Sequence, residues 1–188
     1  MIEIGTKKLE TERLILRKIT KKDALELYQG LANQPEFLYY TNKKPITLQD
    51  EINSLENINE KYNNKSYYNW LITLKDSGKI IGAVNFNVNE RNDSVMFNYA
   101  IDNRFTNNGY MTEALLCVKK FAFSQIKVHR FEGGCVVENI SSKRVMEKCG
   151  LTQEGVLKDY VKLADGYHNM IMFAEISQKN SIKKHWTN

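Results

Sequence analysis

The spacing of hydrophobic residues changes several times along the chain, and each change predicts a secondary-structure element. Apolar and polar residues alternate over residues 9–19, which predicts a half-buried strand. Thr20 precedes a segment with helical spacing, and Thr47 precedes another, so both are expected helix N-caps. The only prolines, Pro35 and Pro45, lie between these two helices in an expected loop.

The second half of the chain predicts a strand-rich arrangement with two further helices. Two β-type runs, residues 67–74 and 79–88, flank Asp76-Ser77-Gly78 and predict a hairpin. The remaining expected elements are a strand, a helix, a strand, a short helix and a last hairpin, over residues 95–101, 109–125, 130–137, 141–149, 156–163 and 168–176. This order indicates a mixed α/β domain over residues 1–178, with residues 179–188 as a C-terminal tail.

The most informative chemistry lies where the strand 95–101 meets the following helix. Asn107, Asn108 and Gly109 tolerate left-handed backbone, which lets successive amides point at one ligand. The first N–H groups of a helix have no internal partner, and the helix dipole favours negative charge there. The segment therefore predicts a diphosphate site, although ordinary strand–helix connections share the pattern. It is neither a Walker A loop nor a dinucleotide fingerprint, because no Gly-Lys-Ser/Thr follows and Gly109 stands alone.

Three segments together carry a family resemblance. Residues 9–17 read LETERLILR, residues 104–115 read RFTNNGYMTEAL, and residues 139–151 read NISSKRVMEKCGL. In this order they resemble the GCN5-related N-acetyltransferase (GNAT) superfamily, and within it the ribosomal-protein N-terminal (Rim-type) branch. The resemblance implies an α/β (α+β) fold with a mixed, mostly antiparallel sheet of about six to seven strands and about four helices. It also implies that the strands 95–101 and 130–137 splay apart to receive acetyl-coenzyme A, with no metal cofactor.

The resemblance assigns a set of residues to the cosubstrate. The family's pyrophosphate loop, Gln/Arg-x-x-Gly-x-Gly/Ala, matches residues 106–111, in which Gly109 agrees while Thr106 and Met111 depart. Asn139 resembles the asparagine that faces the coenzyme, with a helix cap as the alternative role, and Thr112 is either a phosphate contact or an ordinary first-turn residue. The complete expected set is Tyr99, Ala100, Ile101, Thr106, Asn107, Asn108, Gly109, Tyr110, Met111, Thr112, Asn139 and Ser142.

Acetyl transfer also needs a proton for the leaving thiolate. Many superfamily members use a tyrosine in the helix 141–149, but Met146 stands at that position here. The Rim branch offers a serine that matches Ser142, so Ser142 is the expected catalytic acid, with a helix-capping role as its alternative and Tyr160 as a more distant candidate. The base is open, because strand 95–101 carries no carboxylate. The residues considered for it are Glu113, which is expected to be structural, Asp102, Asp159 and His168.

The acceptor follows from the chemistry of amines. An α-amino group has a pKa of about 7.7 to 8.0 and a lysine about 10.4, so a site without a strong base favours an α-amine. We therefore expect an N-terminal α-amine of a protein as the acceptor. A small amine, such as an antibiotic, an amino acid or a polyamine, is the alternative, as is a non-catalytic coenzyme A sensor. Residues 33–44 and the loop before Tyr67 are the expected acceptor region. Phe37, Tyr39 and Tyr40 either line that cleft or pack between helices.

Composition narrows the class of partner. The net charge of +5 comes from scattered lysine pairs and not from a basic stripe, so no nucleic-acid partner is expected. No apolar run approaches the roughly 20 residues of a membrane helix. Three isolated cysteines, Cys117, Cys135 and Cys149, argue for a reducing compartment and against a disulfide framework or a zinc site. A cytoplasmic protein is expected, and exposed sheet edges make a homodimer plausible.

Overall fold

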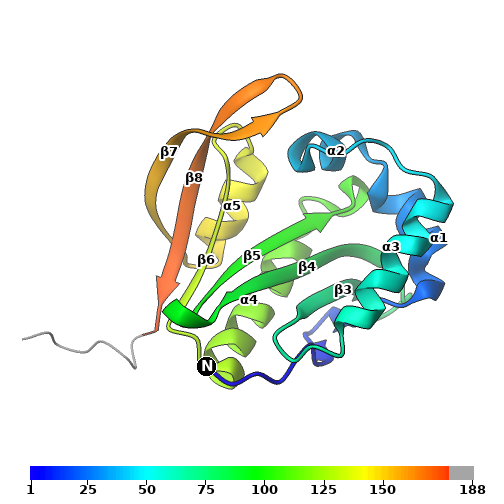
Figure 1. The fold of residues 1–188 in the computed structure, drawn as a ribbon, viewed down its shortest axis with the longest axis horizontal. Helices are drawn as coiled ribbons and strands as arrows, with labels where there is room; N and C mark the ends of the chain where they lie inside the picture. Colours follow the sequence, from blue (N-terminus) through cyan, green and yellow to red (C-terminus); the bar gives the residue numbers. More distant parts are fainter. Residues whose placement is uncertain (178–188) are drawn as a thin grey trace, which may run out of the picture.

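The computed structural model describes residues 1–177, so the tail predicted for 179–188 lies outside the described residues. The fold is built on one eight-stranded sheet in the order β1-β2-β3-β4-β5-β6-β8-β7 (Figure 1). The strands are β1 Leu9–Glu10, β2 Leu14–Arg17, β3 Tyr68–Leu74, β4 Ile80–Asn89, β5 Ser94–Ile101, β6 Arg130–Val136, β7 Thr152–Leu163 and β8 Gly166–Ile176. All neighbours pair antiparallel except β5 and β6, which are parallel. The predicted hairpins 67–88 and 156–176 are confirmed.

The strand count exceeds the expected six to seven because residues 9–19 do not form one strand. The chain turns back after Glu10, and Leu9 pairs with Leu16. The hydroxyl oxygen of Thr11 accepts a hydrogen bond from the Leu14 N–H at 3.0 Å, which closes the turn. Alternation continues on both arms and the turn contains neither glycine nor proline, so the pattern alone predicted a single strand.

In the described residues, 1–177, five α-helices surround the sheet. They are α1 Ala24–Leu27, α2 Pro35–Thr41, α3 Leu48–Lys61, α4 Tyr110–Phe121 and α5 Ile140–Lys148. The expected cap of α3 is confirmed, because Thr47 Oγ1 accepts from the Asp50 N–H at 3.2 Å while Asp50 accepts from the Thr47 N–H. Helix α2 was expected to be a loop. Pro35 begins this helix, where a missing N–H costs nothing, and Asn42 ends it with φ +50°.

Two hydrophobic clusters hold the helices to the sheet. On one face, Leu115 and Val118 of α4 pack with Trp70 and Phe131, all fully buried. On the other face, Leu27 of α1 and Leu55 of α3 pack with Leu71 and Ile80. Burying each such side chain contributes about 1.5 to 3 kcal/mol. Among residues 1–177, no helix is long and apolar enough to cross a membrane.

The centre of the sheet is split, as predicted. β5 and β6 pair only from Ser94 opposite Arg130 to Met96 opposite Glu132. Beyond Met96 the two strands diverge in Figure 1, and β6 continues alongside β8. The Phe97 ring lies against Gly133 at the fork, where any Cβ atom would overlap it. An aromatic ring on β5 and a glycine on β6 therefore mark the point where the sheet opens.

Candidate active site

The loop between β5 and α4 has the backbone that an anion site requires. Asn107 has φ +61° and Gly109, the N-cap of α4, has φ +76°, whereas Asn108 is not left-handed. The first N–H groups of α4, from Tyr110 onward, have no partner within the helix. The positive end of α4 and these donors therefore face the open side of the split sheet.

Arg13, in the turn before β2, holds this loop in place. Its Nη1 donates to the carbonyl oxygen of Asn108 at 3.1 Å, and its guanidinium lies 4.5 Å from the Tyr110 ring centroid. Its Nε donates to Glu113 at 2.7 Å, and Thr11 donates to the same carboxylate at 2.5 Å. Burial raises the pKa of Glu113, but these hydrogen bonds outweigh it and the pKa lies below its usual value. Glu113 therefore has the structural role expected for it.

A cavity of about 510 Å³ opens between the end of β5, the loop before α4, and α5, and we call it the coenzyme cavity. Of the twelve residues expected to bind the cosubstrate, only Asn108 does not line it; the others are Tyr99, Ala100, Ile101, Thr106, Asn107, Gly109, Tyr110, Met111, Thr112, Asn139 and Ser142. The Asn108 side chain instead donates to the Thr106 carbonyl oxygen at 2.8 Å. Thr106, where the family carries Gln or Arg, donates its hydroxyl to the Asn103 carbonyl oxygen at 2.9 Å. Thr106 therefore still bonds within the loop, but it lacks the side-chain donor that a glutamine or arginine would offer to a phosphate.

Two cations that the sequence reasoning missed also line this cavity. Arg144 and Lys148 are exposed, lie one helical turn apart on α5, and so share one face of that helix. Their positive charge and the N-terminus of α4 border the same cavity, so both would stabilise an anionic phosphate bound there. The sequence feature that could have identified them is a pair of cationic residues four positions apart in the helix that follows Asn139. The donor set of this cavity fits acetyl-coenzyme A, with amides and cations for phosphates and apolar Ile140 and Val145 beside them.

Ser142 and Tyr99 meet inside this cavity. The Tyr99 hydroxyl lies 2.8 Å from Ser142 Oγ and donates to the Ser142 carbonyl oxygen at 3.1 Å. Burial raises the pKa of Tyr99 above its usual value, so the phenol stays protonated at neutral pH. The sequence predicted a cosubstrate-binding role for Tyr99, and its contact with Ser142 was not expected. Met146, at the position of the family tyrosine, is fully buried in the core.

Asn139 begins the helix that carries Ser142. Its Oδ1 accepts from the Ser142 N–H and from the Ser141 hydroxyl, each at 3.0 Å. The helix-cap alternative is therefore confirmed, and the same residue also lines the coenzyme cavity. One side chain thus orients Ser142 and borders the space where the cosubstrate is expected.

Comparison with known families settles the class of protein. A family model described as an acetyltransferase (GNAT) domain matches residues 13–152, which is most of the chain. The chain belongs to the GNAT acetyltransferase family. It is an N-acetyltransferase.

Relatives and solved structures agree with this assignment. YoaA of Bacillus subtilis, an uncharacterised N-acetyltransferase, is 28% identical over 81% of this chain and 87% of its own. The ribosomal-protein-serine acetyltransferase of Escherichia coli is 24% identical over 88% of this chain and 94% of its own. The crystal structure of the ribosomal-protein-S5-alanine acetyltransferase of Vibrio fischeri covers 92% of this chain and 97% of its own, with a TM-score of 0.81 at 20% identity. That structural likeness shows the same fold.

The base candidates from the sequence lie outside the cavities of this acetyltransferase. Asp102 is held by Arg104 and Gln34; burial raises its pKa, but these hydrogen bonds outweigh it and the pKa is lowered. His168 bonds to Asp165 at 2.9 Å in the β7–β8 hairpin. Asp159, also in that hairpin, and the alternative acid Tyr160 are exposed. Among residues 1–177, no group of three or more His, Cys, Asp or Glu side chains could hold a metal ion.

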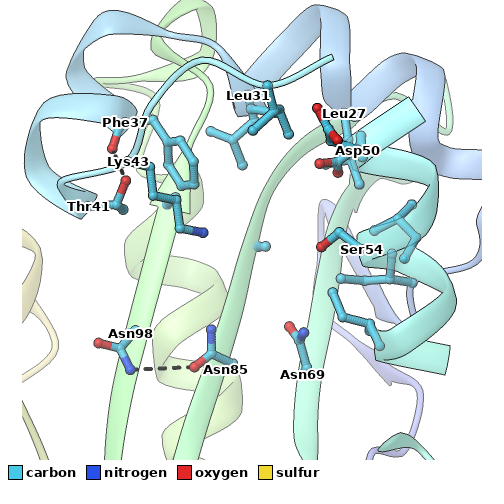
Figure 2. A pocket seen from close by; sticks show the side chains of 18 of the residues that line it. Leu27, Leu31, Phe37, Thr41, Lys43, Asp50, Ser54, Asn69, Asn85 and Asn98 are labelled. Atoms are coloured by element: carbon cyan, nitrogen blue, oxygen red, sulfur yellow. Dashed lines mark hydrogen bonds between the residues drawn. The ribbon is translucent and has the colours of Figure 1, made fainter. Parts of the chain in front are cut away.

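A second cavity of about 500 Å³ lies between α1–α3 and the face of β3, β4 and β5 (Figure 2), and we call it the sheet-face cavity. Phe37, Thr41, Tyr99 and Ala100 line both cavities. The two cavities therefore meet at β5, beside the Tyr99–Ser142 contact. Of the three aromatic residues of the predicted acceptor region, Phe37 lines both cavities and Tyr40 lines the coenzyme cavity, whereas Tyr39 bonds to Asp165 in the hairpin.

Proposed function

We propose that this acetyltransferase modifies the α-amine at the N-terminus of a peptide or protein. The observation that carries the proposal is the junction of the two cavities. The residues common to both are Phe37, Thr41, Tyr99 and Ala100, none of which is a histidine or a carboxylate. None of these four shared residues can act as a strong base for an amine at the junction, so an acceptor that is partly neutral near pH 7 is favoured. The likeness to a ribosomal-protein-serine acetyltransferase supports the same choice.

The reaction follows from the arrangement around Tyr99. The amine nitrogen attacks the thioester carbonyl carbon, a C–N bond forms, and the C–S bond breaks with its electron pair on sulfur. Beyond Met96, no strand pairs with the β6-facing edge of β5 among residues 1–177, so its backbone N–H groups are available to polarise the carbonyl. Ser142 Oγ gives a proton to the thiolate while the Tyr99 hydroxyl donates to Ser142. The proton lost by the acetylated nitrogen replaces the one that Ser142 gave, which leaves a neutral amide and a thiol.

The test is thiol release from acetyl-coenzyme A with acceptors that differ only at the amine. In one short peptide the only amine is the free N-terminus. In the other, the N-terminus is blocked and the only amine is that of a lysine side chain. The proposal predicts release with the free α-amine and little with the blocked peptide. Faster release with the blocked peptide or with a polyamine would overturn the α-amine assignment, and faster release with a free amino acid would overturn the assignment to a peptide or protein.

A further inference from the structure

Glu51 differs from the other buried carboxylates of the molecule. Asp23, Glu51 and Asp102 are 8%, 9% and 1% exposed. Asp23 pairs with Arg17 and Asp102 pairs with Arg104. The Glu51 carboxylate makes no hydrogen bond or ion pair within residues 1–177, and because no fully buried side-chain oxygen there lacks a partner, its oxygen atoms reach the solvent. A largely desolvated carboxylate without a partner favours a cation in the space that it faces.

The surroundings of Glu51 point into the sheet-face cavity. Glu51 lies in the first turn of α3 and lines this cavity beside Leu55 and Ile58. Burial raises the pKa of Glu51, while the positive charge of Lys43 acts in the opposite direction. Lys43 is not an ion-pair partner; it is exposed, and its Nζ lies 5.4 Å from the centroid of the Phe37 ring. The carboxylate therefore faces a space that a ligand can occupy.

Three asparagines form the floor of the same cavity. Asn69, Asn85 and Asn98 lie opposite one another on β3, β4 and β5, and Figure 2 shows them in a row. Asn98 Nδ2 donates to Asn85 Oδ1 at 3.4 Å. Side-chain amides both donate and accept, so this row suits the amide groups of a peptide or other polar groups between two ends of a ligand.

The position of Glu51 sets the length of that ligand. Acetyl transfer takes place at β5, where Tyr99 lines both cavities. Leu55, one helical turn after Glu51, packs with Leu71 on β3. β3 lies two strands away from β5, which is a separation of about 10 Å. A ligand that spans the floor thus has its amine at β5 and its other end near Glu51.

Building on the proposed function, we propose that the sheet-face cavity binds acceptors with a second cationic group about 10 Å from the reacting amine, and that Glu51 selects them. Two sources share this chemistry. One is a peptide whose second residue is lysine or arginine, and the other is a diamine.

The experiment compares matched acceptors by kcat/KM for thiol release. The peptide pair is Ser-Lys amide and Ser-norleucine amide, and the small-molecule pair is 1,7-diaminoheptane and heptylamine. Each pair differs only in the second cation. They are assayed with the wild type, with Glu51→Gln, and with Glu56→Gln as control, because Glu56 lies on the same helix in an exposed pair with Lys21. The pair that shows a preference identifies the source.

We expect the cationic member of one pair to be favoured by about tenfold or more. Glu51→Gln should abolish this preference, while Glu56→Gln should retain it. No preference in either pair, or a preference that survives Glu51→Gln, would overturn the inference. If no acceptor releases thiol, the proposed function fails. In that case the inference about Glu51 is tested separately by binding. The melting temperature is measured with coenzyme A and each member of the matched pairs, and the cationic member should raise it more than the neutral member in the wild type and in Glu56→Gln but not in Glu51→Gln.

Discussion

The hydroxyl of Tyr99 lies 2.8 Å from Ser142 Oγ and joins β5 to α5 across the split in the sheet. Tyr99 comes from the strand that leaves β6, and Ser142 comes from the helix that follows β6. A tyrosine thus reaches the catalytic region from β5, although the helix position that carries a tyrosine in many family members holds the buried Met146. Acid chemistry in this acetyltransferase is therefore expected to depend on two hydroxyl groups.

Removing each hydroxyl tests this relationship. Ser142→Ala is expected to lower kcat by about 10² to 10⁴-fold, because the thiolate loses its proton donor. Tyr99→Phe should lower kcat by about tenfold, the value of one buried hydrogen bond. Affinity for coenzyme A, measured by calorimetry, should change little in either variant. Ser141→Ala is the control, since Ser141 bonds to Asn139 and not to Tyr99. A kcat for Ser142→Ala equal to that of the control would remove Ser142 as the acid.

Arg144 and Lys148 are expected to bind phosphates of the cosubstrate. Arg144→Gln and Lys148→Gln should each raise the Kd for coenzyme A by about three- to tenfold, because each removes one charge-assisted contact. The loss should shrink at high salt, where such charges are screened. Lys143→Gln is the matched control, because Lys143 lies on the same helix beside Glu147 and outside the cavity lining. Equal Kd values for all three variants would place the phosphates elsewhere.

Arg13 is expected to hold the pyrophosphate loop. Arg13→Met removes the donors to Asn108 and Glu113, so the free energy of unfolding should fall by about 1 kcal/mol or more. The Kd for coenzyme A should also rise, because the loop is no longer fixed. Lys8→Met, which breaks only an exposed pair with Glu10, should change neither quantity. Normal coenzyme affinity in Arg13→Met would mean that the loop keeps its shape without this residue.

His168 is expected to titrate above its usual pKa in the folded protein. The hydrogen bond that the His168 ring donates to Asp165 raises this pKa, and the nearby Glu138 adds to it. The stabilising contribution is therefore complete below the unfolded pKa of about 6.5 and is lost as pH rises through the folded value. NMR titration should show a raised pKa in the wild type and a lower one in Asp165→Asn. An unchanged pKa in that variant would show that Asp165 does not hold the ring.

Most of the fold could be predicted from local patterns, and the exceptions have physical causes. The hydrophobic periods of α3 and α4 and the Thr47 cap were sufficient to place those helices. The turn at Thr11 was missed because it contains no glycine or proline, and α2 was missed because its proline stands at the first helical position. Both errors arose at segments whose local sequence is compatible with two backbone conformations.

The site was predictable where backbone dominates and less so where side chains cross between elements. Gly109 and Asn107 predicted the loop between β5 and α4, because both tolerate left-handed backbone. All but one of the expected cosubstrate residues line the coenzyme cavity. The Tyr99–Ser142 contact joins residues 43 positions apart, and no local pattern shows it. Glu51 resembles an ordinary first-turn glutamate that complements the helix dipole, and only its burial without a partner distinguishes it.

The most direct test of the account is to find where the acetyl group goes. A peptide with both a free α-amine and a lysine is incubated with acetyl-coenzyme A and the enzyme, and fragmentation mass spectrometry locates the acetyl group. The account predicts acetylation of the α-amine in the wild type and a strong loss of product in Ser142→Ala. Acetylation confined to the lysine ε-amine, or no acetylated peptide at all, would contradict it.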